Sequence, residues 1–249
     1  MRLIVDDLSV NYEISGKGPC LLMVHGWGDD QKTFDKLRIE LSKNYLVLSV
    51  DLPGFGGTQA PKEVWGLQEY GRFLAHFLEK LQQTPYAVIA HSNGASVALV
   101  ATSEGLLTPS RLVLLGAAGI RDREKIKKHA IKVIAKTGKA ATFWLPESKK
   151  KSLRKRLYGV SGSDMLVAPH LQETFKKTVA QDVQENASRV RLPTLLVYGD
   201  KDTATPPLYG EIYSSKMTNA RLEIVTGAGH FVHNDQTEKV TKLIRDFLS

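Results

Sequence analysis

The stretch that decides the fold begins Tyr86-Ala87-Val88-Ile89-Ala90-His91-Ser92-Asn93-Gly94 and continues to Ser103. Its first five residues form a short apolar run, which is typical of a buried strand. The small residues that follow Gly94 have a helical pattern, so we expect a helix over Gly94–Ser103. Ser92 is therefore expected on a sharp turn from strand to helix, with its hydroxyl lifted above a sheet.

The residues on either side of Ser92 fit this turn. Because the turn is crowded, only small residues fit two positions before and after the serine, and these are Ala90 and Gly94. Glycine is usual at the first of these positions, so Ala90 is a mild departure. The same loose pattern recurs around Ser103, but Ser103 falls at a helix end rather than after a strand. Ser92 is therefore the expected nucleophile.

The rest of the chain alternates short apolar runs with longer helical patterns. This alternation predicts the α/β class, with a mostly parallel sheet covered by helices. The first two strands follow each other closely enough to pair antiparallel. Strands are predicted at Leu3–Val5, Leu8–Ile14, Cys20–Val24, Tyr45–Val50, Tyr86–Ala90, Arg111–Leu115, Thr194–Tyr198 and Leu222–Val225, and helices near Thr33–Leu41, Leu67–Leu81, Gly94–Ser103, Leu208–Ser214 and Thr237–Phe247.

The alternation breaks once, between the strands that end at Leu115 and begin at Thr194. The intervening stretch is helix-prone and longer than a single crossover helix requires. We therefore predict an inserted helical lid, or cap, over residues 121–189. Residues 1–120 and 190–249 would form the core domain.

A serine nucleophile needs a base, and histidine titrates in the useful range. His230 follows a predicted strand and the flexible Gly227-Ala228-Gly229, so a loop could bring it to Ser92. His233 is the nearest rival. The alternatives for His230 are an ordinary surface histidine or, with His233, half of a metal site, but no third ligand cluster is evident.

The imidazolium formed during the reaction needs an orienting carboxylate. Two are available after the predicted strand Thr194–Tyr198, because the next residues are Gly199-Asp200-Lys201-Asp202. Either could instead cap the helix that begins near Pro206. The residues alone leave the choice between Asp200 and Asp202 open.

Several separated motifs occur together in order. They are His25-Gly26-Trp27-Gly28, Asp51-Leu52-Pro53-Gly54-Phe55-Gly56, the turn around Ser92, and the pair Gly199–Asp202 and Gly227–His230. Along its whole length the chain resembles the α/β-hydrolase superfamily, in its serine carboxylesterase-like branch with a helical lid. In that fold the acid and the histidine follow the serine in this order.

The resemblance implies a catalytic triad of Ser92, Asp202 and His230, with Asp200 left as a structural residue. It also implies an oxyanion hole made by the backbone N–H groups of Trp27 and Asn93, which would bind the charge that develops on a carbonyl oxygen. His25 and His91 are expected to be structural. No cofactor is implied, because neither a P-loop nor a dinucleotide-binding pattern is present. No metal is expected, because no third ligand cluster accompanies His230 and His233.

The substrate pocket is predicted from apolar residues near these motifs and in the lid. We expect contributions from Trp27, Phe143, Trp144, Met165 and Phe231. The lid residues could equally pack only against one another and hold the lid together.

The positive charge is concentrated in residues 121–189, which contain 17 Lys/Arg and 7 Asp/Glu and so carry +10, while the rest of the chain carries −2 of the total of +8. A solvated helix face explains this, and steering of an anionic substrate, an acidic partner or membrane lipid is the alternative. The basic run Lys149–Arg156 lacks the interleaved aromatic residues of a base-stacking surface, so nucleic acid is not an expected partner.

Composition limits the remaining possibilities. At 249 residues the chain can bury one sizeable core. Its single cysteine, Cys20, lies in a predicted buried strand, so no internal disulfide is possible and a catalytic thiol is not expected. The N-terminus lacks the apolar core of a signal peptide, and no run is long enough to span a membrane. We therefore expect a cytoplasmic protein, with its oligomeric state open.

The expected activity is hydrolysis of a carboxylic ester of a small molecule. The substrate could be anionic, because the positive segment would attract such a molecule. The resemblance also implies that the same triad could cleave a thioester, an amide, a lactone or a carbon–carbon bond. A dehalogenase or epoxide hydrolase is not favoured, because those relatives use an aspartate where this chain has Ser92. A ligand receptor that keeps a residual triad is the alternative from another class.

Overall fold

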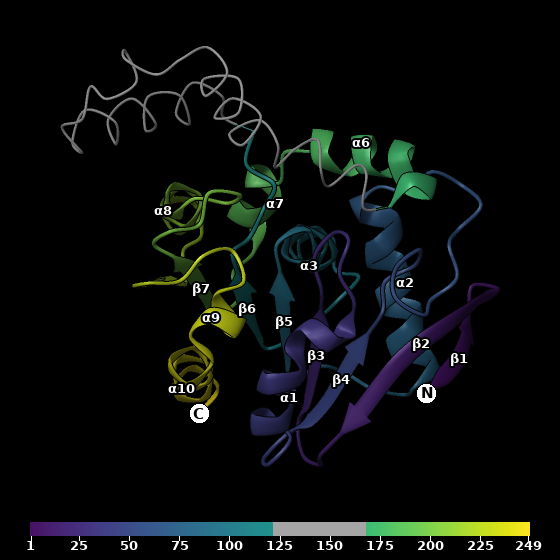
Figure 1. The fold of residues 1–249 in the computed structure, drawn as a ribbon, viewed down its shortest axis with the longest axis horizontal. Helices are drawn as coiled ribbons and strands as arrows, with labels where there is room; N and C mark the ends of the chain where they lie inside the picture. Colours follow the sequence, from purple (N-terminus) through teal and green to yellow (C-terminus); the bar gives the residue numbers. More distant parts are fainter. Residues whose placement is uncertain (122–167) are drawn as a thin grey trace, which may run out of the picture.

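The computed structural model describes residues 1–121 and 168–249 (Figure 1). In these residues eight strands form one sheet in the order β1-β2-β4-β3-β5-β6-β7-β8. The strands are β1 (Arg2–Val5), β2 (Leu8–Ser15), β3 (Cys20–Val24), β4 (Leu46–Val50), β5 (Ala87–His91), β6 (Arg111–Leu115), β7 (Thr194–Gly199) and β8 (Ala220–Val225).

The strand directions confirm the predicted class. The pairs β1–β2 and β2–β4 are antiparallel, and every neighbouring pair from β4 to β8 is parallel. Each of the eight predicted strands in the described chain is present. The largest change is in β8, which begins at Ala220 rather than Leu222.

Helices cover both faces of the sheet because its central strands are apolar on both sides. In β3, Leu22 and Val24 face one core while Leu21 and Met23 face the other. The first core is completed by residues of α2 (Leu67–Lys80), α3 (Asn93–Ser103), α7 (Gln184–Arg189) and α8 (Pro207–Lys216). The second is completed by residues of the 3-10 helix Gln31–Phe34, α1 (Asp35–Leu41), α9 (Val232–Asp235) and α10 (Thr237–Leu248).

The C-terminal helix α10 shows how the sequence pattern sets this packing. Val240, Ile244 and Leu248 recur every four residues and are buried, with Leu243 and Phe247 packed beside them. That spacing places all of them on one side of an α-helix, so α10 lies along the sheet with its charged residues outward.

A short helical segment lies above the carboxyl end of the sheet (Figure 1). It consists of the 3-10 helix Pro169–Leu171 and α6 (Gln172–Ala180). Thr174 Oγ1 and Gln181 Oε1 accept hydrogen bonds from the backbone N–H groups of Trp65 and Leu67, at 3.2 and 2.9 Å. These bonds fix α6 to the beginning of α2.

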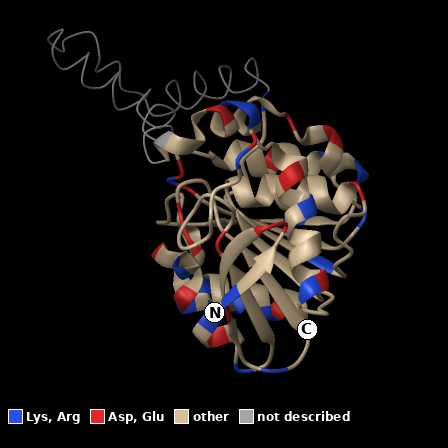
Figure 2. Cartoon of the chain, turned by 90° about the vertical axis from the view of Figure 1, so that its right-hand side faces the viewer, with Lys and Arg blue, Asp and Glu red and all other residues tan. Residues whose placement is uncertain are grey.

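Residues 122–167, which make up most of the predicted lid, lie outside the described residues. The division into a core of residues 1–120 and 190–249 and a lid of residues 121–189 therefore stays a prediction. The described residues contain 21 Lys/Arg and 22 Asp/Glu, so the positive excess belongs to residues 122–167. Along the described chain, Lys and Arg positions are interspersed with Asp and Glu positions (Figure 2).

Among the helices of residues 1–121 and 168–249, none has the length and apolar character needed to cross a membrane.

Candidate active site

Ser92 stands on the predicted turn between β5 and α3. Its backbone has φ 52° and ψ −119°, which is a strained conformation for a residue other than glycine. A β-carbon at Gly94 would lie 2.3 Å from the His25 carbonyl oxygen and 2.6 Å from that of Val24. Gly94 is therefore required by close backbone packing, and Ala90 is accommodated fully buried.

The structure brings Ser92, His230 and Asp202 together, although each follows a different strand. His230 Nε2 lies 3.0 Å from Ser92 Oγ, and His230 Nδ1 lies 2.9 Å from Asp202 Oδ2. The Asp202 side chain is fully buried, whereas 22% of the His230 side chain is exposed. The serine hydroxyl, the imidazole and the carboxylate thus form one continuous hydrogen-bonded chain.

The two acids of the Gly199–Asp202 turn have different environments. Asp202 Oδ1 accepts hydrogen bonds from the backbone N–H groups of Ala204 and Thr205, at 2.8 and 2.9 Å, while its Oδ2 faces His230. Asp200 is exposed, and its Oδ1 accepts a hydrogen bond from the Gly227 N–H at 2.7 Å. Asp202 therefore contacts the imidazole, and Asp200 holds the turn that leads to it.

The loop after β3 lies against Ser92. A β-carbon on Gly26 would come within 3.1 Å of the Ser92 β-carbon. His25 is buried and holds this loop: its Nε2 accepts from the Leu52 N–H at 2.9 Å, and its Nδ1–H donates to the Gly26 carbonyl at 2.7 Å. Burial lowers the pKa of His25, so the neutral tautomer that makes these two bonds is favoured.

Asn93 is the first residue of α3. The first N–H groups of a helix have no acceptor within the helix and carry partial positive charge. The Asn93 amide therefore has the properties of an oxyanion donor, and the oxyanion hole of Trp27 and Asn93 stays a prediction.

Two further histidines pack behind His230. His91 Nε2 donates to the His230 carbonyl oxygen at 3.0 Å, and the two rings lie 4.7 Å apart. His233 Nε2 lies 3.3 Å from Thr33 Oγ1. Burial holds the pKa of His91 well below its ordinary value and lowers that of His233 to about 4. Both are therefore neutral near pH 7, and His233, the rival base, does not contact Ser92.

Aromatic side chains lie around Trp27, in the loop after β3. The Trp27 ring lies 4.8 Å from the ring of Phe55 and 5.0 Å from that of Phe175 on α6. Phe231 is 43% exposed and lies 5.0 Å from the ring of His91. Of the predicted pocket residues, Trp27 and Phe231 therefore lie beside the site. The other three, Phe143, Trp144 and Met165, fall outside the described residues.

The other side chains considered from the sequence are elsewhere. Ser103 is the last residue of α3, and its hydroxyl donates to the Val100 carbonyl at 3.0 Å. Cys20 is buried, and burial raises the pKa of its thiol to about 11. Within the described residues, no group of three or more His, Cys, Asp or Glu side chains is placed to hold a metal ion.

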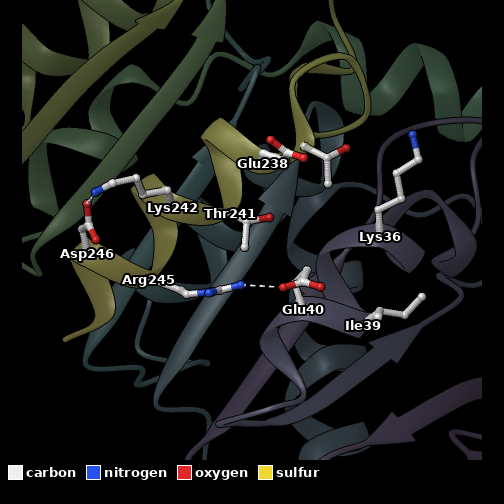
Figure 3. A pocket seen from close by; sticks show the side chains of 9 residues that line it. Lys36, Ile39, Glu40, Glu238, Thr241, Lys242, Arg245 and Asp246 are labelled. Carbon is white, nitrogen blue, oxygen red and sulfur yellow. Dashed lines mark hydrogen bonds and ion pairs between the residues drawn. The ribbon is translucent and has the colours of Figure 1, made fainter.

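A separate hollow of about 710 Å³ lies between α1 and α10 (Figure 3). An ion pair of 2.7 Å between Arg245 and Glu40 connects the two helices across it. It contains neither Ser92 nor His230, and its lining combines cationic and anionic side chains with no histidine. This hollow is therefore separate from the candidate site at Ser92.

Two residues at the site were not singled out from the sequence. Thr205 Oγ1 lies 2.7 Å from Asp202 Oδ2, and Phe175 packs on Trp27. Thr205 had a local signal, since an aspartate side chain commonly accepts from backbone N–H groups a few residues later, as Asp202 does from that of Thr205. The contact between Phe175 and Trp27 joins distant parts of the chain and had no such signal.

Comparison with known proteins identifies the family. The model of the Alpha/beta hydrolase family matches residues 21–243, and the chain belongs to this family.

Similar proteins include several hydrolases. A pyrrolizixenacetamide deacetylase from Xenorhabdus hominickii is 26% identical over 99% of this chain and 97% of its own length. A pimeloyl-[acyl-carrier protein] methyl ester esterase from Neisseria meningitidis is 24% identical over 91% of this chain and 75% of its own. The structure of a meta-cleavage product hydrolase from Pseudomonas fluorescens matches with a TM-score of 0.74 and 19% identity, over 99% of this chain and 96% of that one.

Proposed function

We propose that this protein is a serine hydrolase that cleaves a carboxylic ester through an acyl-enzyme on Ser92. The observation that carries the proposal is the hydrogen-bonded chain from Ser92 through His230 to Asp202, with distances of 3.0 and 2.9 Å. Both distances are within the range needed for proton transfer from a nucleophile to a base that a carboxylate orients.

In the first half of the reaction, His230 Nε2 takes the hydroxyl proton while Ser92 Oγ attacks the ester carbonyl carbon. The tetrahedral intermediate carries its negative charge on the former carbonyl oxygen, which the N–H groups of Trp27 and Asn93 bind. Asp202 stabilises the imidazolium. When the intermediate collapses, the alcohol leaves with the proton from His230, and the acyl group stays on Ser92.

In the second half, water takes the place of the alcohol. His230 removes a proton from this water, whose oxygen attacks the acyl carbonyl and forms a second oxyanion in the same position. Collapse returns the proton to Ser92 Oγ and releases the carboxylic acid. In each half His230 donates the proton that it has accepted, first to the leaving alcohol and then to Ser92, so the steps balance without a cofactor.

The substrate side of the proposal is supported by the aromatic groups at the site. Trp27 and Phe231 would contact the acyl or alcohol part of the ester. The basic residues 122–167 would favour an anionic group at the far end of the substrate. We also propose that residues 121–189 form a cap, which the contact of Phe175 on α6 with Trp27 supports.

The test is hydrolysis of p-nitrophenyl esters of increasing acyl length by the wild type and Ser92→Ala. The expected result is turnover that Ser92→Ala abolishes and that the control Ser103→Ala keeps, because Ser103 lies at the end of α3. Turnover that survives in Ser92→Ala would contradict the proposal.

Cleavage of a carbon–carbon bond is a second candidate, and the similarity to a meta-cleavage product hydrolase favours it. The two candidates are distinguished when the wild type and the same variants are also assayed with a meta-cleavage product as the substrate. Turnover of this compound without turnover of any ester would favour carbon–carbon cleavage. A receptor with a residual triad predicts slow turnover and tight retention of the ligand instead.

A further inference from the structure

Thr205 lies in the loop between β7 and α8 and is only 4% exposed. Its hydroxyl oxygen is within hydrogen-bonding distance of three groups. Asp202 Oδ2 lies at 2.7 Å, the Gly116 carbonyl oxygen at 2.9 Å and His230 Nδ1 at 3.1 Å. A buried hydroxyl is therefore in contact with both the acid and the base of the proposed triad.

The acid uses all of its acceptor positions. A carboxylate offers about four lone-pair sites. At Asp202, Oδ1 accepts from the N–H groups of Ala204 and Thr205, and Oδ2 accepts from His230 Nδ1–H and the Thr205 hydroxyl. If the hydroxyl were removed, the bond from His230 would be the one of these four that still reaches Oδ2. The Thr205 hydroxyl thus fixes the oxygen that faces the imidazole.

The Gly116 carbonyl connects this arrangement to the sheet. Gly116 directly follows β6, and a β-carbon there would lie 3.3 Å from Asp202 Oδ2, from Thr205 Oγ1 and from the His230 carbonyl oxygen. The hydroxyl has one proton and faces two acceptors, Asp202 and Gly116. Its proton can therefore be shared between them or can turn from one to the other.

We propose that Thr205 is a positioning residue for the triad, holding Asp202 Oδ2 against His230 Nδ1. The inference rests on the proposed function. When His230 becomes an imidazolium, the Thr205 hydroxyl keeps its bond to Asp202 Oδ2, so the carboxylate oxygen that accepts from Nδ1–H stays in place. The Thr205 oxygen itself lies 3.1 Å from Nδ1, where its lone pairs face the positive ring. The charge on His230 is thereby stabilised by groups that are already in place and already dehydrated.

A substitution at Thr205 can remove the side-chain hydroxyl without removing the backbone hydrogen bonds to Asp202. The two backbone bonds to Asp202 Oδ1 do not involve the Thr205 side chain. Thr205→Val keeps the shape of the side chain and loses only the hydroxyl, while Thr205→Ser keeps the hydroxyl and loses the methyl group. The control is Thr194→Val, because Thr194 is also buried and its hydroxyl donates to the Leu192 carbonyl at 3.0 Å, away from the triad.

The first experiment measures kcat and KM with the best p-nitrophenyl ester. A lost hydrogen bond to a charged group corresponds to about a tenfold to hundredfold lower kcat, and we expect this fall in Thr205→Val with little change in KM. Thr205→Ser should recover most of the rate, and Thr194→Val should keep it. In an Asp202→Asn background, Thr205→Val should have little further effect, because its partner is already altered.

The inference is overturned if Thr205→Val keeps kcat within about twofold of the wild type, if Thr205→Ser fails to recover activity, or if Thr194→Val loses as much. Ser92→Ala, measured beside them, separates this failure from that of the proposed function. An inactive Ser92→Ala with a fully active Thr205→Val refutes only the role of Thr205. An active Ser92→Ala refutes the proposed mechanism.

A second measurement does not depend on turnover. The proton on His230 Nδ1, assigned by its loss in His230→Gln, can be followed by proton NMR. If Thr205 positions the pair, Thr205→Val shifts this resonance and speeds its exchange with water, and Thr194→Val leaves both unchanged. An unchanged resonance in Thr205→Val would overturn the inference even if the wild type hydrolysed none of the esters.

Discussion

Replacing the buried His233 should make the protein less sensitive to acid. His233 is fully buried, and burial lowers its pKa from 6.5 to about 4. Below about pH 6.5 the unfolded chain binds a proton at this residue, whereas the folded protein binds it only near pH 4. Because the unfolded state binds more protons in this window, lowering the pH favours unfolding. This contribution to stability is present above about pH 6.5 and is lost as the pH falls toward 4.

The magnitude follows from the difference between the two pKa values. It corresponds to about 3 kcal/mol, lost between about pH 7 and pH 4. His233→Phe keeps an aromatic ring against Phe34, whose ring lies 5.1 Å from that of His233, and removes the titration. The variant should therefore lose about 3 kcal/mol less stability than the wild type over this range. Any cost of the substitution itself is the same at each pH and cancels.

The assay is urea unfolding of the wild type and His233→Phe at a series of pH values. His76→Gln is the control, because it removes a histidine whose side chain is half exposed rather than buried. The reasoning would be refuted if the free energy of unfolding fell by the same amount in the wild type and in His233→Phe over this pH range. Some pH dependence should remain in His233→Phe, because the pKa of the buried His91 is also lowered.

Three further predictions concern the site. Asp202→Asn should lower kcat by about a thousandfold or more, whereas Asp200→Asn, which alters an exposed side chain, should keep most of it; equal losses would contradict the assignment of the acid. Gly94→Ala should reduce the free energy of unfolding by about 3 kcal/mol, because its β-carbon would lie 2.3 Å from the His25 carbonyl; an unchanged Tm would contradict this. For a carboxylate-bearing ester, kcat/KM should fall more steeply with salt than for a neutral ester, and parallel curves would argue against steering by the basic residues 122–167.

The sequence by itself determined the class of fold and predicted the turn that carries Ser92, the proposed nucleophile. Both follow from local physical chemistry. An apolar run of about five residues that ends in a crowded turn allows few residue types, so Ser92 and Gly94 are recognisable without any knowledge of their neighbours. The spacing of Val240 and Ile244 likewise fixes which side of α10 is buried. The resemblance of several motifs, in their order along the chain, then predicted Ser92, Asp202 and His230 as the triad.

Only the tertiary structure decided how the parts of the site meet. From the residues alone, Asp200 and Asp202 were equivalent, because each follows the same strand. They differ in the folded protein because the turn directs Asp202 to His230 and leaves Asp200 exposed beside Gly227.

Contacts between distant segments leave no periodic pattern in the sequence. Thr205 meets Gly116 across 89 positions of the chain, and Phe175 reaches Trp27 through the placement of α6. Such contacts depend on which strands are neighbours in the sheet and where their loops converge. That convergence is a property of the whole fold, which places the carboxyl ends of parallel strands at one edge and so brings the loops after β5, β7 and β8 together.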